Sequence, residues 1–350
     1  MVYNYNMSNN DPIIIDNTQY SSFMQCEGYW TEKYVNKVHK PWDGERDDPM
    51  SVGIGFHDLL FNGYKNGVFE MTPKVAQELT LTMDATKEIS IMGEYYRSQY
   101  PSGPVEFDWV GLEEPLAKPV NNDIILKAKV DGFFINNKER TISGGVEDIH
   151  LVPGIYGFET KSKLPGYDRG FYLSEWQAAM QASFQLLTIK HNSERLGFNS
   201  DDVKGILVNV IERPNVYEPR RTCKGCSTMF QTKLYRLEGK NYICPMCEHP
   251  NTFTGPFPSP RVDPPYAYRF LVNRSPERLE VDQDTIIDVA MRMKSIRDKG
   301  TYPVLNRTNC VIVKWKKKCE YYEPHNGLIP VDAIEYPGYK LFNPTAYLER

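Results

Sequence analysis

The chain has 350 residues, of which 41% are hydrophobic and 25% are charged, and its formal net charge is −4. These values are near those of soluble globular proteins, which excludes a fibrous repeat and disorder over most of the chain. The negative net charge argues against a protein that coats nucleic acid through overall basicity. The longest apolar runs fall far short of the ~20 residues that a membrane span needs, and the polar N-terminus lacks the pattern of a secretory signal. We therefore expect a cytoplasmic protein that is not attached to a membrane.

The N-terminal third is predicted to be mainly helical. Residues 1–17 are polar and asparagine-rich, and we expect a flexible arm there. Aromatic residues at helical spacing predict a helix over 20–37. Residues 51–67 contain several glycines and predict a turn that enters a helix. A longer helical region is expected over 73–100, because a proline such as Pro73 is tolerated in a first helical turn.

A pattern of strands begins at about residue 106. Two extended runs, 107–120 and 124–134, flank an Asn-Asn-Asp turn and predict a β-hairpin. Residues 154–163 are predicted to form another strand, and a helix is expected over 174–189. The run 203–212 is almost continuously apolar, as expected of a strand in a sheet that is covered on both faces.

The C-terminal part repeats this alternation after an interruption. Residues 216–260 form a Cys-, Pro- and Gly-rich insert. A strand is then expected over 266–274, and an amphipathic helix over 283–300. The order of elements predicts an α/β fold with a mixed sheet flanked by helices. We expect its core to consist of residues 18–215 and 261–350.

The insert contains a cysteine pattern that is typical of structural zinc sites. Two C-x2-C pairs, Cys223/Cys226 and Cys244/Cys247, are separated by 17 residues. Four thiolates close a tetrahedron around Zn²⁺ and leave no position for water, so the pattern predicts a four-cysteine zinc ribbon without catalytic chemistry. The insert is too small for a core of its own, and metal binding would explain why it folds. Four ordinary thiols are the alternative.

A second pattern indicates metal-dependent hydrolysis. Asp131 lies on one predicted strand, and Glu159 and Lys161 lie two residues apart on the next. Residues two apart on a strand face the same side, so Glu159 and Lys161 project together and Thr160 is turned away. Carboxylates on neighbouring strands can bind one hard divalent cation, and a lysine beside them can hold the attacking water. The alternative is a strand-end aspartate and a surface Glu/Lys pair, which are both common.

This pattern resembles the PD-(D/E)XK nuclease superfamily, and more closely its RecB-like exonuclease branch, which includes phage exonucleases and CRISPR-adaptation nucleases. The segment GIGFHDLL resembles the Gly…His motif of that branch. The resemblance implies a metal site formed by His57, Asp131, Glu159 and Thr160. It implies a restriction-endonuclease-like fold around this site.

Two further positions are compared with the branch. The segment EWQAAMQASFQLL resembles the helix after the E-x-K strand, which places Gln177 at the glutamine position of the family. Gln181 departs from the family pattern, because a tyrosine often stands there. Glu114 lies where many relatives carry a glutamate. The resemblance implies that Lys161 positions the attacking water and that Gln177 orients the substrate or Lys161.

The resemblance implies a Mg²⁺- or Mn²⁺-dependent deoxyribonuclease, and an exonuclease rather than an endonuclease. It also implies DNA as the partner, with a recombinase, single-strand-binding protein or helicase as a further one, in a phage or mobile-element setting. A catalytically silent nuclease fold, whose zinc ribbon binds DNA or a protein, is the alternative. The Glu159/Lys161 pair argues against that alternative, because a scaffold has no need of it.

The remaining cysteines partly match the iron–sulfur pattern of some members of this branch. Cys26 lies before the Gly…His motif, and Cys310 and Cys319 lie near the C-terminus. The fourth cysteine is missing, and His325 stands near its expected place. Because a cluster normally requires four thiolates, we expect a degenerate site with no cluster.

Overall fold

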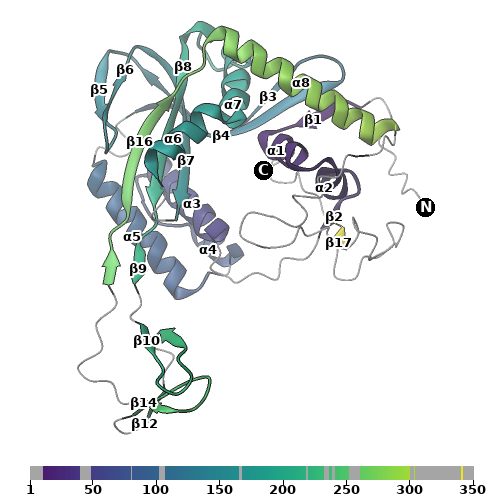
Figure 1. Ribbon diagram of the computed structural model, residues 1–350. Helices are drawn as coiled ribbons and strands as arrows, with labels where there is room; N and C mark the ends of the chain where they lie inside the picture. Colours follow the sequence, from purple (N-terminus) through teal and green to yellow (C-terminus); the bar gives the residue numbers. More distant parts are fainter. Residues whose placement is uncertain are drawn as a thin grey trace.

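A mixed six-stranded sheet forms the centre of the molecule, in the order β1-β4-β7-β8-β16 with β3 also paired to β4 (Figure 1). The computed structural model describes residues 11–39, 49–79, 81–101, 107–164, 168–217, 220–231, 236–238, 241–251, 261–299, 303 and 340–341. The strands of the central sheet are β1 (Ile13–Ile15), β3 (Asp108–Pro119), β4 (Ile124–Asn136), β7 (Gly154–Lys163), β8 (Val203–Glu212) and β16 (Tyr266–Val272).

The predicted hairpin and the predicted buried strand are both confirmed. Strands β3 and β4 pair in antiparallel fashion, and the Asn121 side chain accepts a 2.8 Å hydrogen bond from the Asp123 backbone N–H in the turn between them. Strand β8 pairs with β7 on one side and β16 on the other, and nine of its ten residues are buried. This burial explains its almost unbroken apolar sequence.

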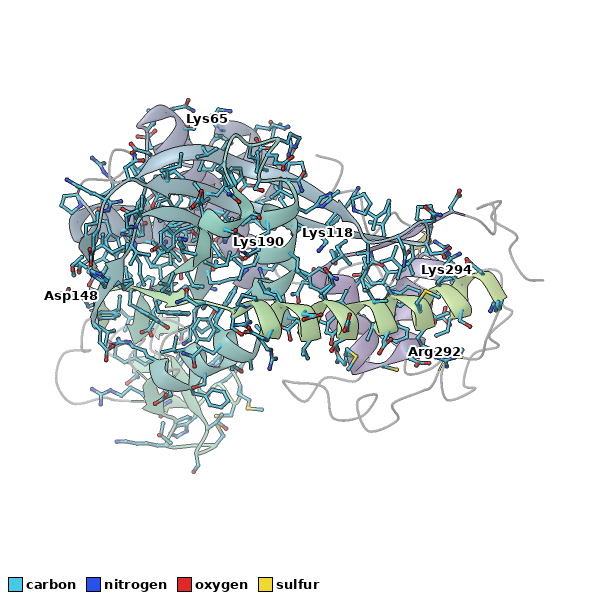
Figure 2. All side chains as sticks on the ribbon, turned by 90° about the horizontal axis from the view of Figure 1, so that it is seen from above. Lys65, Lys118, Asp148, Lys190, Arg292 and Lys294 are labelled. Atoms are coloured by element: carbon cyan, nitrogen blue, oxygen red, sulfur yellow. The ribbon has the colours of Figure 1, made fainter. Side chains whose placement is uncertain are left out.

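Helices cover the sheet on both faces. The described helices are α1 (Asn17–Gln25), α2 (Glu27–Trp30), a π-helical turn (Thr31–Val35), α3 (Pro49–Asn66), α4 (Pro73–Leu79), α5 (Met83–Gln99), α6 (Arg169–Ala178), α7 (Met180–His191) and α8 (Pro276–Lys299). One buried cluster includes side chains from α3 and α5, and another includes side chains from α1, α7 and α8. Helix α8 is the long helix in Figure 2, which labels Arg292 on it. The Arg292 guanidinium donates to the Glu27 carboxylate of α2 at 2.9 Å.

The expected N-terminal arm ends earlier than residue 17. Residues Ile13–Ile15 form strand β1, which pairs in parallel with the start of β4. Ile13 and Ile15 are buried there, and this apolar contact explains why the segment forms a strand. The Asp16 side chain then caps α1 by accepting a 2.7 Å hydrogen bond from the Gln19 backbone N–H. Residues 1–10 lie outside the described part of the chain.

Four helix predictions are corrected. The expected helix over 20–37 is α1, α2 and the π-helical turn, because Cys26 has an extended backbone. The expected helix over 174–189 is two helices, because Ala179 has an extended backbone between α6 and α7. The region 73–100 is likewise two helices, and the Thr82 side chain caps the second by accepting from the Ala85 N–H at 3.2 Å. The segment 51–67, expected to begin with a turn, is helical in α3 nearly throughout. Within α3, Gly53, Gly55 and Gly63 pack closely on other side chains, so close packing compensates for their low helix propensity.

Small sheets surround the core. Strand β5 (Arg140–Ser143) pairs with β6 (Asp148–Leu151), β9 (Asn215–Tyr217) with β15 (Arg261–Asp263), and β2 (Val38–His39) with β17 (Lys340–Leu341). The insert contains β10 (Arg220–Thr222), β11 (Met229–Gln231), β12 (Arg236–Glu238), β13 (Asn241–Ile243) and β14 (Pro250–Asn251). It projects beyond β9, away from the central sheet (Figure 1). Within the described residues, no helix is both long and apolar enough to cross a bilayer.

Candidate active site and cysteine cluster

A cavity of about 840 Å³ opens where the central sheet splits. The pairing of β1 with β4 ends at Leu126, and the pairing of β7 with β4 begins only at Gly132. Between these points, Lys127, Lys129 and Asp131 occupy alternate positions of β4 and line the cavity. Side chains from α3 and α7 reach the same space. The split therefore lets groups from both helical layers meet.

His57, Glu113 and Asp131 form one group in this cavity. Each offers a ligand atom, and these atoms all lie within 4.8 Å of one another. His57 comes from α3, and its Nδ1 lies 3.4 Å from Asp131 Oδ2. That same oxygen accepts a 2.7 Å hydrogen bond from the Thr160 backbone N–H. Asp131 thus joins β4 to β7 at the point where the ladder between these strands stops.

Glu113 has an unusual backbone and its own lysine partner. Its φ of 55° lies in the left-handed region, which is rare for a residue with a side chain. Its Oε2 lies 2.5 Å from the Lys129 ammonium. Strained residues of this kind are concentrated at functional sites.

Glu159 is held by three donors. Its carboxylate is almost fully buried, and its Oε1 accepts a 2.7 Å hydrogen bond from Gln181 Nε2. Oε2 accepts from Gln185 Nε2 at 2.5 Å. The Lys161 ammonium also contacts Oε1, and it lies 5.7 Å from the centre of the Trp176 ring. These contacts fix Glu159 and Lys161 relative to each other and to α7.

The charges of the group depend on its burial. Burial, and then the nearby Glu159, raise the pKa of Asp131 well above its usual range. Burial, and then Lys161, lower the pKa of His57 to about 4, so the imidazole is neutral at pH 7. Burial disfavours the charged form of Lys161, but Glu159 and Asp131 outweigh it and raise the pKa of the ammonium. A neutral imidazole beside two carboxylates is a suitable donor set for a divalent cation.

The structure brings His57, Asp131, Glu159 and Lys161 to one cavity. Thr160 does not line this cavity, and its contact with the group is through its backbone N–H, so its side chain is not placed as a ligand.

Gln177, expected in the site, is exposed on α6 and does not line the cavity. The break at Ala179 changes which helix face meets Glu159, and Gln181 and Gln185 occupy that face instead. Gln181 had stood out in the sequence only as a departure from the family pattern. Gln185 follows it by one helical turn, and that i, i+4 spacing is the signal that could have identified both.

Glu113, and not Glu114, faces the cavity. Alternation along an ideal strand does not identify it, because β3 has a register shift near Gly111 and a left-handed residue at Glu113 itself. The sequence alone does not show which of these two neighbouring glutamates faces the cavity, because that depends on the local backbone.

The four cysteines of the insert lie together. Cys223, Cys226, Cys244 and Cys247 each place a sulfur within 4.8 Å of the others, and this group could bind zinc. In each pair, an N–H two residues after the first cysteine donates to its sulfur, from Gly225 to Cys223 at 3.3 Å and from Met246 to Cys244 at 3.4 Å.

The two cysteine loops have the same backbone form. Ser227 and Glu248 each follow a second cysteine, and both have a left-handed φ, of 57° and 54°. Their N–H groups donate to the carbonyls of Cys223 and Cys244 at 2.9 and 3.1 Å. Two equivalent loops that aim N–H groups at sulfur suit thiolates around one ion.

The expected degenerate iron–sulfur site is only partly visible. Cys26 is buried at the junction of α1 and α2. Cys310, Cys319 and His325 lie outside the described residues, so the predicted absence of a cluster stays a prediction.

No protein-family model matches the sequence, and no curated protein matches it. Among solved structures, the chain is similar to a protein from Eubacterium rectale named a "putative exonuclease". The identity is 12%, the TM-score is 0.43, and the match covers 90% of this chain and 94% of that one.

Proposed function

We propose that this chain is a metal-dependent nuclease that hydrolyses DNA phosphodiester bonds, with a PD-(D/E)XK-type active site. One observation carries the proposal. An imidazole, three carboxylates and an ammonium from α3, β3, β4 and β7 meet in one cavity at the split of the sheet. The fold gathers ionisable groups from these four elements at a cost in desolvation that a purely structural role does not require.

In this proposal, His57, Glu113 and Asp131 hold Mg²⁺ or Mn²⁺, and Glu159, expected from the sequence as a further ligand, contacts Lys161 instead. The donor chemistry fits, because carboxylates suit both ions and imidazole is tolerated best by Mn²⁺. A cation bound there supplies charge that polarises the phosphate and lowers the pKa of water. Burial first, and then the nearby Glu159 carboxylate, raise the pKa of Asp131, and a bound cation would favour its ionised form.

Lys161 then positions the attacking water. Its ammonium is charged at neutral pH, and Glu159 holds it at the edge of the cavity. Gln181 and Gln185 fix Glu159 in turn, so the lysine is oriented by a buried network and not by solvent. Preference for exonuclease action follows from the sequence resemblance alone.

The insert has a structural role in this proposal, with one Zn²⁺ bound by its four cysteines. Four thiolates leave no open position, so the zinc takes no part in hydrolysis.

The test uses single- and double-stranded DNA labelled at the 5′ or 3′ end, with Mg²⁺ or Mn²⁺. We expect end-dependent loss of label, which chelation of the divalent ion stops and which Asp131→Asn lacks. A folded wild-type protein that degrades none of these substrates with either metal would overturn the proposal, and would favour a silent scaffold that binds DNA or protein.

A further inference from the structure

A second, smaller cavity lies directly beside the acidic site. Its volume is about 330 Å³, within the usual range of small ligand pockets. Asn17, Lys161 and Gln181 line both cavities. The proposed catalytic lysine therefore stands at the boundary between the metal-binding group and a separate space, here called the side cavity.

The side cavity is lined mainly by aromatic and apolar groups. Tyr20, Tyr172, Trp176 and Met180 are among its lining residues, and Tyr172 is the most exposed of the three rings. Aromatic rings of this kind are the usual platform on which unpaired bases stack. The pocket therefore suits a flat ligand.

The charges of the side cavity favour a base over a phosphate. Among the described residues that line it, Lys161 at the boundary is the one cation, and Glu175 contributes a carboxylate. A carboxylate repels phosphate but accepts a hydrogen bond from the exocyclic amine of a base. The main cavity has more carboxylates, among them Glu113 and Asp131, but the proposed divalent cation would bind there and offset their charge, and Lys127 and Lys129 also line it. Alternate residues of a strand are about 7 Å apart, so these two ammonium groups can follow a nucleic-acid backbone.

We infer that the side cavity binds one unstacked base of the substrate strand, next to the phosphate that is cut. This inference rests on the proposed nuclease function and deepens it. The backbone of the same strand runs along Lys129 and Lys127, and the base beyond Lys161 enters the side cavity. A base in a Watson–Crick pair cannot enter, so the substrate is single-stranded at the cut site. A fully paired stretch must first lose stacking and pairing there, which costs a few kcal/mol.

The experiment moves a single abasic residue stepwise along a short single-stranded DNA. The abasic residue keeps every phosphate and removes one base. For the wild-type enzyme with Mn²⁺, we expect one position, at a fixed distance from the cut, to lower kcat/KM by about 5- to 150-fold, the range expected for the loss of one base–aromatic stack. Equal cleavage at every abasic position would overturn the inference and leave the nuclease function intact.

Tyr172 provides the matching change in the protein. In Tyr172→Ala, the abasic position should lose most of its penalty, because the stacking partner is already gone. Tyr172→Phe keeps the ring and should keep the penalty. Phe171 is an exposed aromatic residue on the same helix and lines neither cavity, so Phe171→Ala is the control and should behave as wild type.

The comparison within each variant separates binding from folding. A variant that is merely destabilised loses rate on the normal and abasic DNA alike, so the ratio between them stays at the wild-type value. That result for Tyr172→Ala would contradict the inference. Failure of the wild type to cut any DNA would instead refute the proposed function.

Discussion

Replacement of Lys161 by alanine separates catalysis from folding at this site. A group that positions or deprotonates water contributes typically 10²- to 10⁴-fold to the rate. We therefore expect Lys161→Ala to lower kcat for DNA hydrolysis by that factor, which corresponds to about 3–5 kcal/mol of activation free energy.

The fold should tolerate the change. Lys161 is about a third exposed, so water replaces part of its contact with Glu159. The carboxylate also keeps its hydrogen bonds from Gln181 and Gln185, at 2.7 and 2.5 Å. Because the buried Glu159 loses its cation but keeps two hydrogen bonds, the change should lower the free energy of unfolding by about 1–3 kcal/mol. Urea denaturation at constant m-value would measure it.

Binding of Mn²⁺ completes the comparison. Lys161→Ala keeps all three candidate ligands and should bind Mn²⁺ as the wild type does, whereas Asp131→Asn should not. Lys190 lies on α7 and bonds to the Ser200 carbonyl at 2.9 Å, outside both cavities, so Lys190→Ala is a matched control for removal of a lysine (Figure 2). Wild-type rates in Lys161→Ala, or loss of its Mn²⁺ binding, would refute the assigned role.

Elements defined by local pattern were predictable from the sequence. The β3–β4 hairpin follows from two extended runs around a turn, and β8 follows from its apolar run. The break between α6 and α7 was not predictable in this way, because Ala179 is a good helix former. Tertiary contacts determine it, since the Arg274 guanidinium donates to the carbonyls of Trp176 and Ala179 at 3.3 and 3.1 Å. Arg274 lies some 95 residues further along the chain.

In the candidate site too, side-chain directions that depend on an irregular backbone were not predictable from local pattern. Residues whose direction follows from strand alternation, such as Asp131 and Lys161, line one cavity. Because the helix breaks at Ala179, Gln181 lines the cavity and Gln177 does not. Because Glu113 has a left-handed backbone, Glu113 lines the cavity and Glu114 does not. Periodicity predicts a side chain's direction only while the backbone stays regular.

Three further predictions test the metal sites and the helix junction. Glu113→Gln should weaken Mn²⁺ binding at least tenfold by calorimetry, because it removes a charged oxygen ligand, while Glu114→Gln outside the cavity should not. Elemental analysis should find about one zinc per wild-type chain, and Cys244→Ser should release it and unfold the insert while urea unfolding of the central sheet stays at the wild-type midpoint. Arg274→Ala should lower the free energy of unfolding by about 2–3 kcal/mol. The arginine is almost fully buried, and its loss removes the side-chain donor to the carbonyls at the α6–α7 junction. The buried Asp282 then keeps its surface partner Arg278 at 2.8 Å and its hydrogen bond from the Ser183 hydroxyl at 2.5 Å. An unchanged urea midpoint in that variant would show that the junction does not depend on the guanidinium.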